Sequence, residues 1–64
     1  MTQPVNFLKY KYKEWARGYV FVFESSGRDI DAANAWARDK IPKEHRPHIR
    51  PYVEKEFTDR GYAI

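Results

Sequence analysis

The sequence predicts a small α+β domain in which an antiparallel sheet, an N-terminal hairpin plus a third strand, packs against one α-helix in ββαβ order. Three observations lead to this fold class. Side chains alternate between apolar and basic over residues 8–13, residues 19–23 form an unbroken run of β-branched and aromatic residues, and residues 30–41 change to helical spacing. The chain has 64 residues and no cysteine, so we expect a single domain that folds without disulfides.

The N-terminal segments predict the hairpin. The alternating side chains are Leu8, Tyr10 and Tyr12 on one side and Lys9, Lys11 and Lys13 on the other. A period of two is typical of a strand with one apolar and one solvated face. Residues 16–18 are expected to form a turn in which Gly18 adopts a positive φ, and residues 19–24 the second strand. Residues 1–5, with Pro4, are expected to be a loose arm.

A helix is predicted from about residue 29 to residue 41. Asp29 is a candidate N-cap, either alone or in a capping box with Ser26. The apolar stripe consists of Ile30, Ala33, Ala37 and Ile41, with Trp36 on its flank. Pro42 should end the helix, because the residue before a proline disfavours helical geometry.

Residues 49–61 allow two interpretations after the loop "PKEHRP". As an edge strand containing Pro51, they would be followed by a turn at "TDRG" and a short terminal strand "YAI". As a helix, they would have Pro51 at its first position and Gly61 just past its end. The strand is preferred, because one helix and one hairpin leave a sheet face that a third strand would help to cover.

Catalysis and metal binding are not expected. Ser25 and Ser26 fall where helix capping already accounts for them, and the three glycines are too scattered to form a phosphate loop. His45 and His48 are separated by Pro47 and have no cysteine to complete a zinc site. We therefore predict a protein that is not an enzyme and carries no cofactor or metal.

The predicted function is protein binding or self-association. The chain carries five Tyr, four Phe and two Trp, and one helix covers only one face of a small sheet. The rings expected to stay exposed and to form the interface are Trp15, Tyr19, Phe21 and Phe23.

Nucleic-acid binding is the alternative function. A net charge of +3 permits such a partner without requiring one. Basic side chains interleaved with rings would follow phosphates and stack on bases. The candidate residues are Lys9, Tyr10, Lys11, Tyr12, Lys13, Arg17, Arg46, His48 and Arg50.

Residues 19–42 carry one loose resemblance. The order of strand, "ESS", alanine-rich helix with a tryptophan, and "IP" resembles small bacteriophage proteins that bind and inhibit a host enzyme such as RNA polymerase. The resemblance implies a small inhibitor or adaptor of a host enzyme, and it assigns no functional residue. The sequence shows neither a signal-peptide pattern nor a membrane-length apolar run, so a cytoplasmic location in the host cell is expected.

Overall fold

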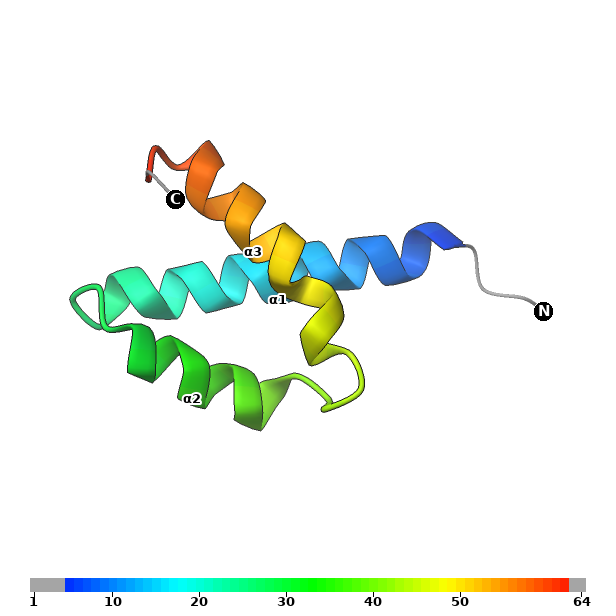
Figure 1. Cartoon of the computed structure of the whole chain (residues 1–64), viewed down its shortest axis with the longest axis horizontal. Coiled ribbons are helices and arrows are strands. Elements are labelled where there is room, and N and C mark those ends of the chain that lie inside the picture. Colours follow the sequence, from blue (N-terminus) through cyan, green and yellow to red (C-terminus); the bar gives the residue numbers. More distant parts are fainter. Residues whose placement is uncertain (1–4, 63–64) are drawn as a thin grey trace.

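The computed structural model describes residues 5–62, with side chains from residue 8 onward, and it is built of three α-helices. These are α1 (Val5–Ser25), α2 (Ile30–Lys40) and α3 (Arg46–Asp59). Figure 1 shows α2 running back along the C-terminal half of α1, while α3 crosses over the middle of α1. Residues 5–62 contain no strand. The predicted α+β class, the sheet and the ββαβ order are therefore wrong, and the domain is all-helical.

The predicted hairpin is replaced by the single long helix α1. Its inward-facing residues, at helical spacing, are Tyr12, Trp15, Ala16, Tyr19, Val20 and Phe23. Spacings of three and four residues place these side chains on one face, where α2 and α3 pack. Burial on that face outweighs the strand preference of residues 19–23, because local propensity is weaker than tertiary packing. Of the predicted loose arm, Val5 belongs to α1, and residues 1–4 lie outside the described residues.

Gly18 lies inside α1 and forms no turn. It packs against the Trp36 indole of α2: a Cβ atom built on Gly18 would lie 2.7 Å from Cζ2 and 3.3 Å from Cζ3 of that ring. Real Cβ atoms essentially never show a contact of 2.7 Å, and 3.3 Å is tighter than nine in ten real Cβ contacts. The absence of a side chain at Gly18 thus lets α2 approach α1 closely. This packing role replaces the predicted role of Gly18 as a turn residue with a positive φ.

The predicted helix over residues 29–41 is confirmed. The Asp29 carboxylate accepts hydrogen bonds from the backbone N–H groups of Asp31 (3.0 Å) and Ala32 (3.4 Å), and so acts as the N-cap of α2. Ile41 adopts an extended backbone at the other end, ahead of Pro42. Within the stripe, Ala33, Ala37 and Ile41 are buried and Ile30 is exposed.

The preferred strand interpretation of residues 49–61 is wrong, and the helical alternative is right. Helix α3 starts earlier than that alternative placed it, with Pro47 in the first turn and Pro51 in the interior. A first-turn proline costs little, because those N–H groups have no intrahelical partner.

The C-terminus of α3 is a Schellman motif, which confirms Gly61 as the residue that follows the helix. Gly61 has a φ of 93°, its N–H bonds to the Thr58 carbonyl (3.0 Å), and the Tyr62 N–H bonds to the Phe57 carbonyl (2.9 Å). The Tyr62 and Phe57 rings meet at a centroid distance of 5.3 Å. The hydrophobic contact common in this motif is therefore present.

The centre of the core is small and aliphatic, and half-buried rings surround it. The buried residues are Ala16, Val20, Ala33, Ala37, Ile41 and Ile49. Small central side chains let α2 and α3 approach α1 closely. The rings contribute area from the periphery, where the hydroxyls of Tyr12, Tyr19 and Tyr62 reach polar partners.

A polar cluster ties the end of α3 to the end of α1. The Glu24 carboxylate accepts hydrogen bonds from the Arg60 guanidinium and from the Tyr62 hydroxyl (2.9 Å), and Arg60 also donates to Glu56 at 3.0 Å. The hydrogen bond from Tyr62, followed by Arg60, holds the pKa of Glu24 below its ordinary value of 4.5. The ionised form of Glu24 is therefore favoured by folding.

Replacing Glu24 with glutamine is expected to weaken the acid dependence of stability. Because folding lowers the Glu24 pKa, its contribution is present above pH 4.5 and is lost as pH falls through the lower folded-state value. Urea unfolding followed by circular dichroism between neutral and acidic pH measures this slope. Glu14→Gln is the control, since Glu14 is exposed and makes no ion pair among the described residues. Equal slopes for Glu24→Gln and the parent chain would contradict the expectation.

Candidate functional site

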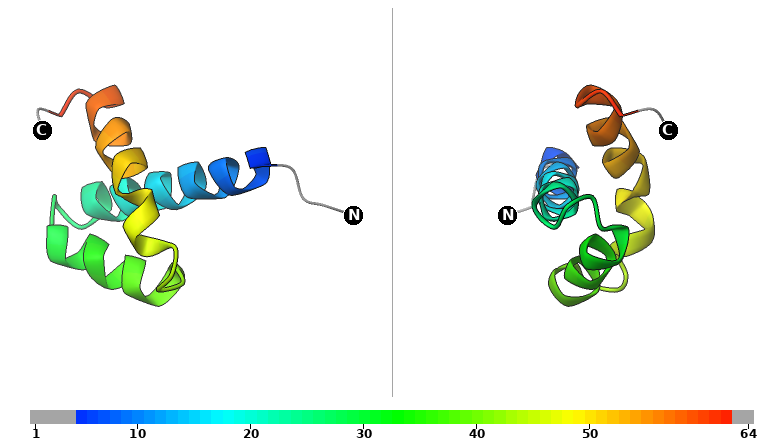
Figure 2. Two further views of the ribbon diagram at one scale, coloured as in Figure 1. Left: turned by 45° about the vertical axis from the view of Figure 1, so that its right-hand side comes forward. Right: turned by 90° about the vertical axis from the view of Figure 1, so that its left-hand side faces the viewer.

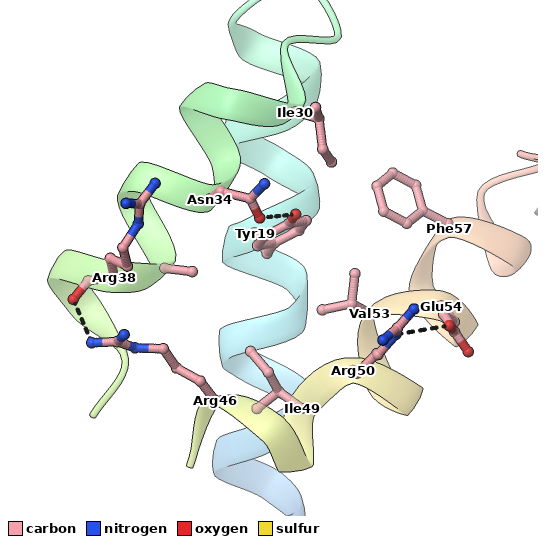
Figure 3. A pocket seen from close by; sticks show the side chains of 11 residues that line it. Tyr19, Ile30, Asn34, Arg38, Arg46, Ile49, Arg50, Val53, Glu54 and Phe57 are labelled. Atoms are coloured by element: carbon pink, nitrogen blue, oxygen red, sulfur yellow. Dashed lines mark hydrogen bonds and ion pairs between the residues drawn. The ribbon is translucent and has the colours of Figure 1, made fainter. Parts of the chain in front are cut away.

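A groove lies between α2 and α3, and α1 forms its floor. Both helices pack on α1 but make little direct contact with each other, which leaves an open volume of about 690 Å³. In Figure 3, Ile30 of α2 and Phe57 of α3 face one another at one end, and Arg38 and Arg46 lie toward the other. The apolar lining residues are Tyr19, Ile30, Ala37, Ile49, Val53 and Phe57, and the polar ones are Asn34, Arg38, Arg46, Arg50 and Glu54.

Tyr19 gives the floor an apolar character although it carries a hydroxyl. That hydroxyl donates a hydrogen bond to Asn34 Oδ1 at 2.5 Å, which fixes the ring between the two walls. Burial raises the pKa of Tyr19 above its ordinary value of 10.0, so the side chain is neutral in any physiological buffer. The Phe57 ring meets Tyr19 edge-on, with a centroid distance of 6.5 Å. The polar atom is thus satisfied within the protein, and the ring faces the groove.

Arg46 is held in place at one end of the groove. Its Nε donates to the Ile41 carbonyl and its Nη2 to the Arg38 carbonyl, each at 3.0 Å. These carbonyls belong to the end of α2, where helices lack backbone donors. A guanidinium has five N–H donors, so three remain after these two bonds. Arg46 therefore caps α2 and still presents an oriented positive charge.

Arg50 is more loosely held on the rim. It forms an ion pair with Glu54 at 3.5 Å, and its side chain is 84% exposed. An exposed pair of this kind contributes little to stability. Arg50 is accordingly available to a competing anion. The groove lining as a whole carries three arginines and one glutamate.

The two histidines of the segment "HRPHIRP" pack on Tyr12. The Tyr12 hydroxyl is hydrogen-bonded to His45 Nδ1 at 3.1 Å, and the His48 ring lies nearly parallel to the Tyr12 ring at a centroid distance of 6.3 Å. Trp15 and Tyr52 extend this cluster, with ring centroids 6.1 and 5.6 Å from that of Tyr12. Over the described part of the chain, no three metal-ligating side chains gather at one point. Both histidines thus serve to join α3 to α1.

The four rings predicted to form one protein-binding surface are divided between two faces of α1. Trp15, Tyr19 and Phe23 are half-buried beneath α2 and α3, whereas Phe21 is 64% exposed and points away from them. The prediction relied on a sheet, in which all four would have been close to one open face. Of the four, Tyr19 lines the groove.

The residues predicted for nucleic acid are also dispersed. A helix turns Lys9 and Lys13 to one side and Lys11 to the other, where the Lys11 ammonium lies 5.2 Å from the centroid of the Trp15 ring. The predicted row of three lysines required a strand and is wrong. The remaining residues lie as follows: Tyr10 and Arg17 are exposed on α1, Tyr12 and His48 pack together, and Arg46 and Arg50 line the groove.

Sequence reasoning missed most of the groove. Arg46, Ile49, Arg50, Val53 and Phe57 recur at intervals of three and four residues, which is the signal of one helix face. The sequence analysis prefers a strand here, because a third strand would help to cover the predicted sheet, so this helix face is not predicted. The shared face of Ile30, Asn34 and Arg38 follows from the confirmed helix α2. That this face lines a groove depends on where α3 lies.

Comparison with protein-family models, with characterised proteins and with solved structures found no match. The resemblance to phage inhibitors also loses its first element, because residues 19–24 belong to α1. None of the helices within residues 5–62 is both long and apolar enough to cross a bilayer. The site itself therefore carries the functional argument.

Proposed function

We propose that the protein is a non-enzymatic binding module whose groove between α2 and α3 receives an acidic, amphipathic helix from a partner protein. The observation that supports this is the composition of the groove: six apolar residues line its walls and floor, and three arginines stand among its polar residues. Apolar surface supplies the affinity of such grooves, and charge at the rim selects the partner.

A helix fits this groove better than an extended peptide. Extended peptides commonly bind by adding a strand to a sheet edge, and residues 5–62 contain no strand. An amphipathic helix presents apolar side chains every three or four residues. Ile30, Ile49 and Phe57 line the groove and offer apolar surface to such side chains. Ile30 and Phe57 lie on opposite walls of the groove.

The charge of the groove favours an acidic partner. Arg38, Arg46 and Arg50 outnumber the one carboxylate of the lining, and that carboxylate is already paired with Arg50. Carboxylates of the incoming helix would bind guanidinium groups in bidentate geometry. The lining contains no serine, cysteine or histidine, which favours binding over nucleophilic catalysis.

The nucleic-acid hypothesis remains a prediction with weaker support. It needed one stripe of basic and aromatic side chains, and the helix separates Lys11 from Lys9 and Lys13. We expect the encounter with a protein partner to occur in the cytoplasm, since a chain without cysteine needs no oxidising compartment.

Peptide selection tests the proposed function. Random peptides displayed on phage and selected on the immobilised protein should converge on sequences with aspartate or glutamate and with apolar residues at helical spacing. The Arg50→Glu variant should bind the selected peptides at least about tenfold more weakly, because each lost charge-assisted hydrogen bond is worth about 1.5–3 kcal/mol. Isothermal titration calorimetry measures the change.

The matched control is Lys43→Glu, which makes the same charge change at an exposed position outside the groove. It should leave the affinity within about a factor of two. Selected peptides without acidic residues, or equal losses for Arg50→Glu and Lys43→Glu, would contradict the proposal.

A further inference from the structure

The exposed side of α1 carries a defined pattern, and at Arg17 it borders a hollow that α1 shares with α3. Residues Tyr10, Glu14, Arg17 and Phe21 are all exposed and follow one another at intervals of four, three and four residues, so they form one stripe along the helix. We call this stripe the outer face of α1. In the right-hand view of Figure 2, α2 and α3 lie around part of α1 and leave the remaining side uncovered.

Two large rings remain uncovered on the outer face. Tyr10 is 63% and Phe21 is 64% exposed, the highest values among the exposed large hydrophobic residues of the described chain. The charged pair between these rings is also unsatisfied internally: neither Glu14 nor Arg17 makes an ion pair within residues 8–62. An uncovered apolar patch with charged neighbours is typical of an interaction surface.

The order of these residues is self-complementary. The midpoint of the stripe falls between residues 15 and 16, with Tyr10 and Phe21 equally far from it, and Glu14 and Arg17 equally far from it. If two copies of α1 lie antiparallel about a twofold axis at this midpoint, Glu14 of one copy faces Arg17 of the other. Tyr10 then faces Phe21 at both ends. Twofold interfaces are built from such self-matching patches.

We propose that the outer face of α1 binds a second copy of this chain in antiparallel orientation, forming a symmetric homodimer. A parallel arrangement would place Glu14 against Glu14 and Arg17 against Arg17, and like charges opposite one another oppose association. The charges therefore select the antiparallel register, and the rings supply the apolar area. This proposal is independent of the groove, which opens between α2 and α3.

The dimer is expected to be weak and reversible. Its stripe spans eleven helical steps, or about 16 Å at roughly 1.5 Å per residue, and contacts of this size belong to the low end of specific interfaces. Sedimentation velocity over a wide range of protein concentrations should show the monomer converting to dimer. A chain that sediments as a monomer up to the highest concentration would overturn the proposal.

Charge reversal tests the register. Arg17→Glu and Glu14→Arg should each weaken dimerisation at least about tenfold, because each brings like charges together twice across the axis. The double variant Glu14→Arg/Arg17→Glu should restore the parent affinity, since the complementary pairs are reformed with their signs exchanged. An equimolar mixture of the two single variants should form a heterodimer for the same reason.

Two further outcomes would overturn the proposal: dimerisation unchanged by Arg17→Glu, or loss in the single variants without recovery in the double variant. Circular dichroism confirms that these exposed substitutions leave the helices intact. Arg50→Glu should leave the dimer unchanged, and Arg17→Glu should leave peptide binding in the groove unchanged. Failure of one proposal is thereby separated from failure of the other.

Discussion

Replacing Ile41 with alanine is expected to lower the free energy of unfolding by about 3 kcal/mol, within the range of roughly 2–5 for a buried isoleucine. Ile41 is only 1% exposed and packs with Ala37 and Ile49, where the three helices meet. Its backbone N–H bonds to the Ala37 carbonyl and its own carbonyl accepts from Arg46. These bonds survive the substitution, so the loss reports the side chain and the cavity that it leaves.

Ile30→Ala is the matched control for this experiment. It removes the same atoms at the first residue of α2, whereas Ile41 follows the last, and Ile30 is 46% exposed, so the expected loss is below about 1 kcal/mol. Urea unfolding of both variants, followed by far-ultraviolet circular dichroism, gives the comparison. For so short a chain, the Ile41→Ala loss is a large part of the total stability. Equal losses at the two positions would show that Ile41 does not occupy the core.

Gly18→Ala is expected to destabilise the protein, although alanine is the better helix former. In an unobstructed helix the substitution would stabilise by about 1 kcal/mol. Here the added methyl group meets Cζ2 and Cζ3 of Trp36 at 2.7 and 3.3 Å, so the indole must move. Overpacking of this kind costs about 1–3 kcal/mol, and a net loss of about 1 kcal/mol should be seen in thermal or urea unfolding.

The sign of the Gly18→Ala effect should reverse when Trp36 is replaced by leucine. Leucine lacks the indole atoms that meet the methyl group, so the helix propensity of alanine is then the remaining effect. The double-mutant cycle isolates the contact between the two positions. A loss of the same size in both backgrounds would mean that Gly18 is required for a reason other than its contact with Trp36.

Helix α2 was predictable because all of its local signals agree. Asp29 supplies the N-cap, alanines occupy the inward stripe, and Pro42 stops the helix, so propensity, spacing and capping point to one structure. The long helix α1 was not predicted, because its sequence carries two periods at once. Lysines between tyrosines imitate a strand, and the run from Tyr19 to Phe23 has strong β propensity.

The predicted roles of Gly18 and Pro51 are both wrong. Each was interpreted from its backbone preference, as a turn residue and as a strand-edge residue. In the structure, the absence of a side chain at Gly18 provides room for Trp36, and Pro51 lies inside α3. The contact between α1 and α2 decides the role of Gly18, and one sequence does not reveal which helices will meet. The groove escaped prediction likewise, because it is defined by the separation of α2 and α3.

The packing of α2 and α3 on α1, rather than on each other, has a mechanical consequence. Near the connection between them, the two helices are joined by Arg46 and by the contact of Ile41 with Ile49. At the opposite end, Ile30 and Phe57 face each other across open space. Because α2 and α3 are tied to each other only near Arg46 in the described part of the chain, a change in the angle between them would widen or narrow the groove at its Ile30–Phe57 end without unwinding either helix.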